Sequence, residues 1–150
     1  MSLNLGKSNQ AIERIVLPNG ITLIVVENQA AGLIAGRFFL KNAGLIQENI
    51  NQAGLSHLVA AVITKGTEDL SAIEIAEKVE STGASLGADA SADYFLLSLK
   101  TVTHDFPSIL ELMGEIMRSP TFPEAEVELE KKLAIQSILS QQEQPFNVAF

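Results

Sequence analysis

The chain has 150 residues, with ten Lys and Arg side chains against 18 Asp and Glu, and a formal net charge of −8 at pH 7. Hydrophobic residues make up 47% of the sequence, which excludes a disordered polyelectrolyte and leaves enough apolar side chains for the core of one domain. The absence of cysteine excludes disulfide scaffolds, thiolate zinc sites and cysteine nucleophiles.

Charge is unevenly distributed along the chain, because residues 1–65 carry a net charge of +2 and residues 66–150 a net charge of −10. Such an acidic second half, without tryptophan, argues against nucleic-acid binding. No apolar run reaches the roughly 18–20 residues of a membrane-spanning helix, so we expect no membrane partner. Residues 1–10 are polar and lack a signal core, so they predict a flexible tail and a cytoplasmic protein, unless a targeting signal was removed.

The first third of the sequence has the pattern of β-strands. Strands are predicted at 12–17 and 21–27, on either side of Asn19-Gly20, because both residues of a tight hairpin turn must tolerate positive φ. A third β-like stretch covers residues 33–40. Three strands in succession favour an antiparallel sheet over a doubly wound parallel one.

The apolar period then changes from that of a strand to that of a helix. Apolar residues recur at helical spacing in a segment closed by Lys65-Gly66: Leu55, Leu58, Val59, Val62 and Ile63. A second helix is predicted to begin at Ser71, which forms a capping box with Glu74, and to stop at Gly83.

The second half of the chain repeats the strand and helix patterns. Residues 84–92 and 94–102 predict a second hairpin, and Asp105 is expected to cap a third helix that ends before Ser119-Pro120. Residues 124–142 predict a long fourth helix. The element order βββααββαα predicts an α+β fold, in which a mostly antiparallel sheet packs against helices.

The last residues of the sequence, Pro145 to Phe150, are largely apolar and resemble the beginning of another element. We therefore expect residues 1–150 to form a single domain that is the N-terminal portion of a longer one.

Residue types that could carry chemistry are few. The two histidines, His57 and His104, are far apart and form no His-x-x-x-His pair, so composition alone favours a helical, non-ligating His57 and a solvent-facing His104. The acidic residues at the start of the fourth helix are expected to form a solvated face with Lys131 and Lys132 as partners: Glu124, Glu126, Glu128 and Glu130.

Residues 54–67, Gly-Leu-Ser-His-Leu-Val-Ala-Ala-Val-Ile-Thr-Lys-Gly-Thr, resemble the zinc helix of the pitrilysin/insulinase-type metallopeptidases, which include the mitochondrial processing peptidases. Further landmarks of that family agree in order and spacing along nearly the whole chain: residues 17–26, 36–44, 80–94, 119–122 and 128–138. The resemblance implies a metallopeptidase-like α/β domain.

The resemblance also implies which positions would carry the family's inverted His-x-x-Glu-His motif. Only the first position, His57, is kept, whereas the water-activating Glu is Ala60 and the second His is Ala61. The third ligand of the family falls on Ser137, or on Gln136 in a register shifted by one residue. Because catalytic zinc needs three protein ligands, we predict no bound zinc, no other cofactor and no catalytic residue in this chain.

The resemblance therefore implies a non-catalytic homologue: a degenerate subunit that pairs with an active zinc metallopeptidase subunit of the same family and helps to bind peptide substrate. One alternative is a purely structural, core-type subunit of a larger assembly. A second alternative is an active enzyme that uses Ser56 with His57, although adjacent helical side chains point about 100° apart.

Overall fold

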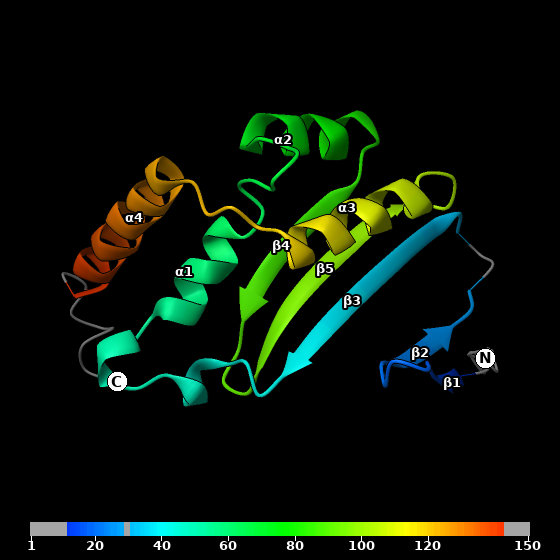
Figure 1. Cartoon of the computed structure of the whole chain (residues 1–150), viewed down its shortest axis with the longest axis horizontal. Coiled ribbons are helices and arrows are strands. Elements are labelled where there is room, and N and C mark those ends of the chain that lie inside the picture. Colours follow the sequence, from blue (N-terminus) through cyan, green and yellow to red (C-terminus); the bar gives the residue numbers. More distant parts are fainter. Residues whose placement is uncertain (1–11, 29–30, 143–150) are drawn as a thin grey trace, which may run out of the picture. The chain divides into compact units, whose positions relative to one another are not determined.

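The computed structural model describes residues 12–28 and 31–142 (Figure 1). The chain divides into two compact units, Met1–Gly32 and Leu33–Phe150. The expected flexible tail at 1–10 and the apolar end at 145–150 lie outside the described residues, and the single domain stays a prediction. Within the described ranges, no helix is both long and apolar enough to cross a membrane.

The first unit contains the predicted hairpin, formed by β1 (Ile12–Val16) and β2 (Thr22–Val26). The two strands are antiparallel, with Ile12 opposite Val26. In the turn, Gly20 adopts a φ of +86°, and the Asn19 side-chain oxygen accepts a hydrogen bond from the backbone N–H of Ile21. Every residue of both strands is exposed.

The second unit is built on a three-stranded sheet of β3 (Leu33–Lys41), β4 (Ser85–Ala90) and β5 (Tyr94–Val102). Its strand order is β3-β5-β4, and both pairings are antiparallel. The antiparallel prediction is confirmed, but β3 is hydrogen-bonded to the distant β5 and not to β2, which pairs with β1 in a sheet of its own. In the nine-residue register of β3 with β5, the inward-facing residues of one strand lie opposite those of the other. The order of the strands along the chain does not predict this pairing.

Four helices complete this unit, close to their predicted bounds: α1 (Leu55–Val62), α2 (Ala72–Ser81), α3 (Phe106–Arg118) and α4 (Glu124–Gln142). Two short 3-10 helices, Leu45–Gln47 and Ile50–Gln52, were not predicted and link β3 to α1. The α+β class is confirmed.

The helix starts test the predicted caps. The capping box of α2 is confirmed, since the Ser71 hydroxyl accepts from the Glu74 N–H at 3.3 Å and the Ser71 N–H donates to the Glu74 carboxylate at 2.8 Å. The predicted N-cap residue of α3, Asp105, lies at that position, but its side chain makes no capping hydrogen bond. Asp105 has helical backbone angles, φ −93° and ψ −5°, and its carboxylate lies 2.8 Å from Nδ1 of His104. A side-chain cap requires an extended backbone at that position, so the Asp105 carboxylate does not cap the helix.

The core lies between the helices and one face of the sheet, which we call the inner face. Strand residues of the core cluster all belong to this face: Phe38, Leu40, Leu86, Ala88, Ala90, Phe95, Leu97 and Leu99. Helix α3 contributes the most buried side chains to the cluster: Ile109, Leu112, Met113 and Ile116. Burial of this inner layer holds α3 against β5.

Candidate functional site: the α1–α4 pair

The N-terminus of α1 is fixed by a carboxylate from the preceding loop. Glu48 accepts hydrogen bonds from the backbone N–H groups of Gly54, at 2.8 Å, and Ser56, at 2.6 Å. The Ser56 hydroxyl, together with these two amides, holds the pKa of Glu48 below its ordinary value of 4.5. Sequence reasoning missed Glu48, because a cap six and eight residues away does not follow the local S/T-x-x-E pattern.

The two sides of α1 have different surroundings. Val59, Ala60 and the following Ile63 pack with the core cluster, whereas His57 is exposed. Ala61 is half-buried and lies one helical turn from His57, so the two residues share one stripe of the helix. That stripe offers one imidazole and one methyl group.

Helix α4 packs beside α1 and runs in the opposite direction (Figure 1). At one end of the pair, the Lys65 ammonium lies 3.6 Å from the Glu130 carboxylate and 4.0 Å from that of Glu126. The expected fully solvated acidic face is therefore only partly correct. Glu128 pairs with Lys131 at 2.6 Å, but Glu126 and Glu130 face Lys65 because the packing of α1 on α4 brings that cation to them.

Helical geometry indicates where Ser137 lies relative to His57. Glu126, Glu130 and Ser137 fall within about 40° of one another around α4, so they share the stripe that faces α1. From Glu130 on to Ser137 the rise along α4 is about 10 Å, in the direction in which α1 runs back from Val62 to His57. Ser137 thus stays the predicted third-ligand position. Gln136 lies about 100° off the stripe, which disfavours the shifted register.

The remaining sequence candidates lie elsewhere or serve other roles. His104 has a 94% exposed side chain at the start of α3, which confirms that it faces solvent. The backbone N–H of Ser56 donates to the Glu48 carboxylate and its hydroxyl helps to lower the pKa of Glu48, so Ser56 takes part in the capping of α1. Within residues 12–28 and 31–142, no group of three or more His, Cys, Asp or Glu side chains is placed to hold a metal ion.

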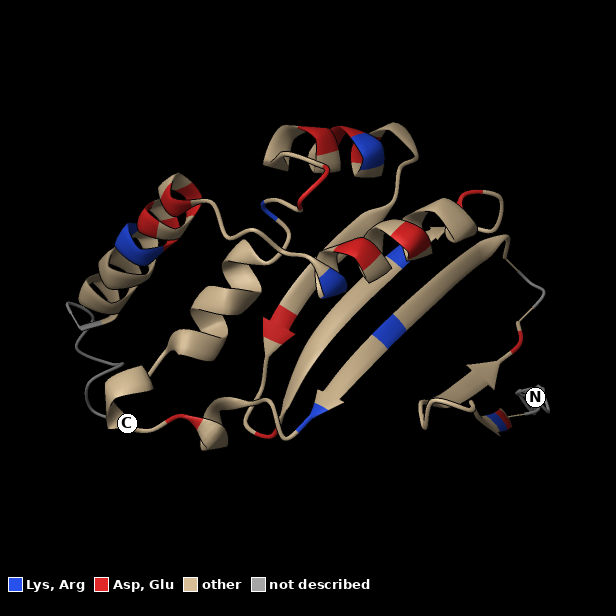
Figure 2. Ribbon diagram, in the orientation of Figure 1, with Lys and Arg blue, Asp and Glu red and all other residues tan. Residues whose placement is uncertain are grey.

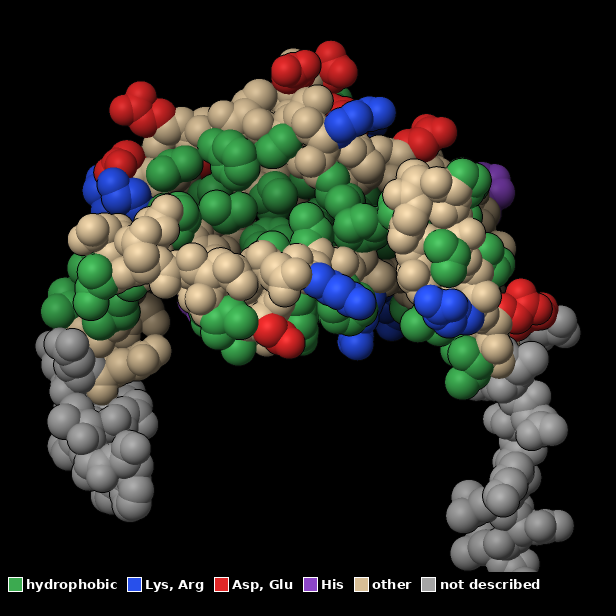
Figure 3. Space-filling model, turned by 60° about the horizontal axis from the view of Figure 1, so that its bottom comes forward, with side chains coloured by type: hydrophobic (Ala, Val, Ile, Leu, Met, Phe, Trp, Pro, Cys, Tyr) green, Lys and Arg blue, Asp and Glu red, His purple; other side chains and the backbone are tan. Residues whose placement is uncertain are grey.

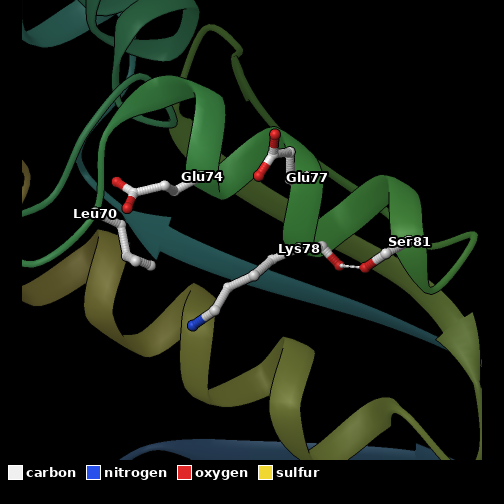
Figure 4. A pocket seen from close by; sticks show the side chains of 5 residues that line it. All are labelled: Leu70, Glu74, Glu77, Lys78 and Ser81. Carbon is white, nitrogen blue, oxygen red and sulfur yellow. Dashed lines mark hydrogen bonds between the residues drawn. The ribbon is translucent and has the colours of Figure 1, made fainter.

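Two surface pockets accompany the helices. An apolar pocket of about 310 Å³ opens between α1 and the sheet, with Leu55 and Val59 on one wall and Leu40 and Phe95 on another, and apolar side chains gather in a hollow in Figure 3. A larger one of about 440 Å³ runs along α2, between Leu70 and Ser81, and the Ser81 hydroxyl donates to the Lys78 carbonyl there (Figure 4). The α2 pocket contains no residue of α1 or α4, so it is separate from the candidate site.

The sequence profile of the family "Insulinase (Peptidase family M16)" matches residues 38–150, which include the end of β3 and the whole of α1 and α4. The chain belongs to this family. The resemblance drawn from residues 54–67 is therefore confirmed at the level of the family.

Relatives of this M16 chain include a respiratory-complex subunit and a processing-peptidase subunit. It is 29% identical over 118 residues to cytochrome b-c1 complex subunit 2, mitochondrial, of Rattus norvegicus, covering 79% of this chain and 26% of that protein. It is 25% identical over 142 residues to mitochondrial-processing peptidase subunit beta of Bos taurus, covering 88% of this chain and 29% of that one.

The fold of this M16 chain is also found in a crystal structure, described as a peptidase M16 inactive domain from Pseudomonas fluorescens. The TM-score is 0.83 at 24% identity, covering 92% of this chain and 34% of that one. That likeness shows the fold. The chain spans about a quarter to a third of the length of these relatives.

Proposed function

We propose that this chain is the non-catalytic subunit of an M16 pair and that its partner is an active, zinc-bearing subunit of the same family. The observation that carries the proposal is which residues occupy the positions that the resemblance implies for the zinc site: His57, Ala60 and Ala61 on α1, and Ser137 on α4. One imidazole and one hydroxyl do not fit zinc, which takes three protein ligands and an open position in catalytic sites. The site also lacks a carboxylate at Ala60 to act as general base.

Assistance in peptide binding is the second part of the proposal. In the described part of the sheet, β4 is hydrogen-bonded to β5 on one side only, and α1 packs next to it. An edge strand can accept an extended peptide through its free backbone N–H and C=O groups. The edge of β4 therefore supports a role in holding an extended substrate segment close to the α1–α4 pair.

The experiment that tests the pairing is co-purification of the tagged native protein, followed by zinc analysis and a quenched-fluorescent peptide assay. The proposal expects an M16 partner with an intact His-x-x-Glu-His motif, one zinc per pair, and cleavage by the pair but not by this chain alone. Chelator-sensitive cleavage by the purified chain alone, with zinc supplied, would overturn it.

The competing proposal is a structural subunit of a larger assembly, and it is favoured by the similarity to a cytochrome b-c1 complex subunit. The same co-purification separates the two. A structural subunit would bring down several unrelated proteins and no zinc-bearing M16 chain.

A further inference from the structure

The described part of the chain buries two polar side chains, those of Thr67 and Thr101, which are 5% and 2% exposed. The two hydroxyl groups differ in their partners. The Thr67 hydroxyl donates to the Glu115 carboxylate of α3 and accepts from the backbone N–H of Leu70 at 3.0 Å. The Thr101 hydroxyl has no hydrogen-bond partner among the described residues. Thr67 therefore links α3 to the segment that follows α1, through a buried hydroxyl with two partners, one of them a carboxylate.

The segment that follows α1 is also hydrogen-bonded to the segment that joins α3 to α4, which crosses the end of α1 in Figure 1. The Glu68 N–H donates to the Ser119 carbonyl at 3.2 Å, and the Thr121 N–H donates to the Gly66 carbonyl at 3.1 Å. The two segments run antiparallel. This short ladder ends close to the first residue of α4, Glu124, so it fixes the point from which that helix starts.

The backbone between the ladder and α4 is strained. Phe122 adopts a φ of +47°, in the left-handed region that a bulky residue rarely occupies. Such a conformation persists only where the surrounding structure imposes it. Gly66 lies so close to Thr121 and Pro123 that no side chain fits between them. This close contact and the ladder together hold the segment on its strained path into α4.

The ion pairs between α1 and α4 lie at the same place. Lys65, directly before the ladder, contacts the carboxylates of Glu126 and Glu130. Figure 2 shows acidic positions in the first turns of α4 and a basic position in the segment that follows α1. Among the described residues, the hydrogen bonds and ion pairs that link α1 or its following segment with α4 or its preceding segment all lie at this end. Helix α4 is thus anchored on α1 from its start.

We propose that Thr67 and Glu115 are positioning residues for the α1–α4 pair. Their hydrogen bond fixes the end of α1 to the core helix α3, and the ladder transmits that position to the start of α4. The spacing between the stripes of His57 and Ser137 then depends on a bond that involves neither residue. The proposal goes beyond the pairing above, because it concerns how this chain holds its own helices and requires neither a partner nor zinc.

The test uses the fluorophore bimane, which tryptophan quenches at short range. The sequence contains no Cys and no Trp, so Ser137→Cys labelled with bimane and His57→Trp place one fluorophore and one quencher in the full chain. With the native Thr67, the emission should be quenched relative to the labelled chain that keeps His57. Thr67→Val should lose at least about half of this quenching, because the Glu115 carboxylate is left without its donor and the ladder shifts.

Thr101→Val is the matched control, since it makes the same change at a buried threonine whose hydroxyl has no partner among the described residues. It should keep the quenching. Thr67→Ser retains the hydroxyl and should keep it as well. Urea unfolding establishes that each variant is folded. If Thr67→Val does not fold, Glu115→Ala replaces it and should lose quenching in the same direction.

The proposal is overturned if the bimane is not quenched in the chain with native Thr67, or if Thr67→Val keeps the quenching. It is also overturned if Thr101→Val or Thr67→Ser loses as much of the quenching as Thr67→Val. The co-purification and cleavage assays of the proposed pairing are independent of this emission, so a failure here is distinguishable from a failure of that proposal.

Discussion

Helices α3 and α4 follow one another in the chain but are held in different ways. Helix α3 buries four apolar side chains against the inner face of the sheet, and Ile116 is 0% exposed. In α4, by contrast, every residue from 131 to 141 is exposed, and the helix is tied to α1 through its first turns, where Lys65 meets Glu126 and Glu130. One helix is fixed by core burial and the other by contacts at its edge.

Two of the positions that the resemblance implies for a metal site, Ala61 and Ser137, therefore lie apart from the residues that hold the fold. Packing of α3 on β5 constrains volume and shape, so substitution there disrupts the fold. Residues on the facing stripes of α1 and α4, such as Ala61 and Ser137, lie outside the core cluster. Residues at these two positions can therefore change without disturbing the buried layer that holds the fold.

The largest expected loss of stability comes from shortening a buried side chain of α3. Ile116→Ala should lower the free energy of unfolding by about 2–5 kcal/mol, because it leaves a cavity in the buried layer. The matched change in α4, Leu133→Ala, should cost less than about 1 kcal/mol, since Leu133 is 48% exposed. Urea unfolding measures both, and equal losses would contradict the division between the two helices.

A smaller loss is expected at the junction that leads from α1 toward α2 and contacts the segment before α4. A Cβ at Gly66 would lie 2.7 Å from the Thr121 hydroxyl and 3.1 Å from the Pro123 ring. Gly66→Ala should therefore destabilise the protein by about 1–3 kcal/mol through overpacking. Gly87→Ala, where nothing lies within 4 Å of the new methyl group, is the control and should not destabilise. Comparable losses in the two variants would show that crowding at Gly66 is not the cause.

The smallest effect concerns the Glu48 cap of α1 and is best seen as a pH dependence. Because the folded state lowers the pKa of Glu48 below 4.5, its ionised form stabilises the fold above that pH. The stabilisation is lost as pH falls through the lowered pKa. Glu48→Gln should thus be less stable than wild type at pH 7, and the difference should shrink below about pH 4.5.

The pKa of Glu74 is also lowered, by its hydrogen bonds with Ser71. Because Glu74 is present in both proteins, its contribution cancels from the difference in stability between wild type and Glu48→Gln. Urea unfolding at pH 7 and pH 3 is the measurement. A gap between wild type and Glu48→Gln that stays constant with pH would contradict the role given to the cap.

Much of the fold could be predicted from local patterns, but the contacts between distant segments could not. The turn at Asn19-Gly20 and the capping box at Ser71 are local, and both are found as expected. The pairing of β3 with β5 and the reach of Glu48 to Ser56 depend on chain segments that sequence periodicity does not connect. Asp105 lies at the N-cap position of α3 but its carboxylate makes no capping hydrogen bond, because side-chain type alone does not determine backbone conformation.

The metal positions were predictable only through the resemblance to a family. Without the resemblance, the sequence predicts only that His57, Ala60 and Ala61 lie on a helix. The structure adds that His57 and Ala61 share one stripe of that helix. Ser137 has no local signal at all, since it lies 80 residues after His57 and on another helix. Its placement follows from the antiparallel course of α1 and α4 and from the spacing to Glu126 and Glu130.

Zinc titration calorimetry of wild type, Ala61→His, Ser137→Glu and the double variant tests the central claim most directly. The claim is that the α1–α4 pair keeps the geometry of the family's metal site and lacks only the ligands. Wild type should bind no stoichiometric zinc, and the double variant should bind zinc at least about tenfold more tightly than either single variant. A double variant that folds but binds zinc no more tightly than the single variants would contradict the claim, because Ser137 would then not stand opposite His57.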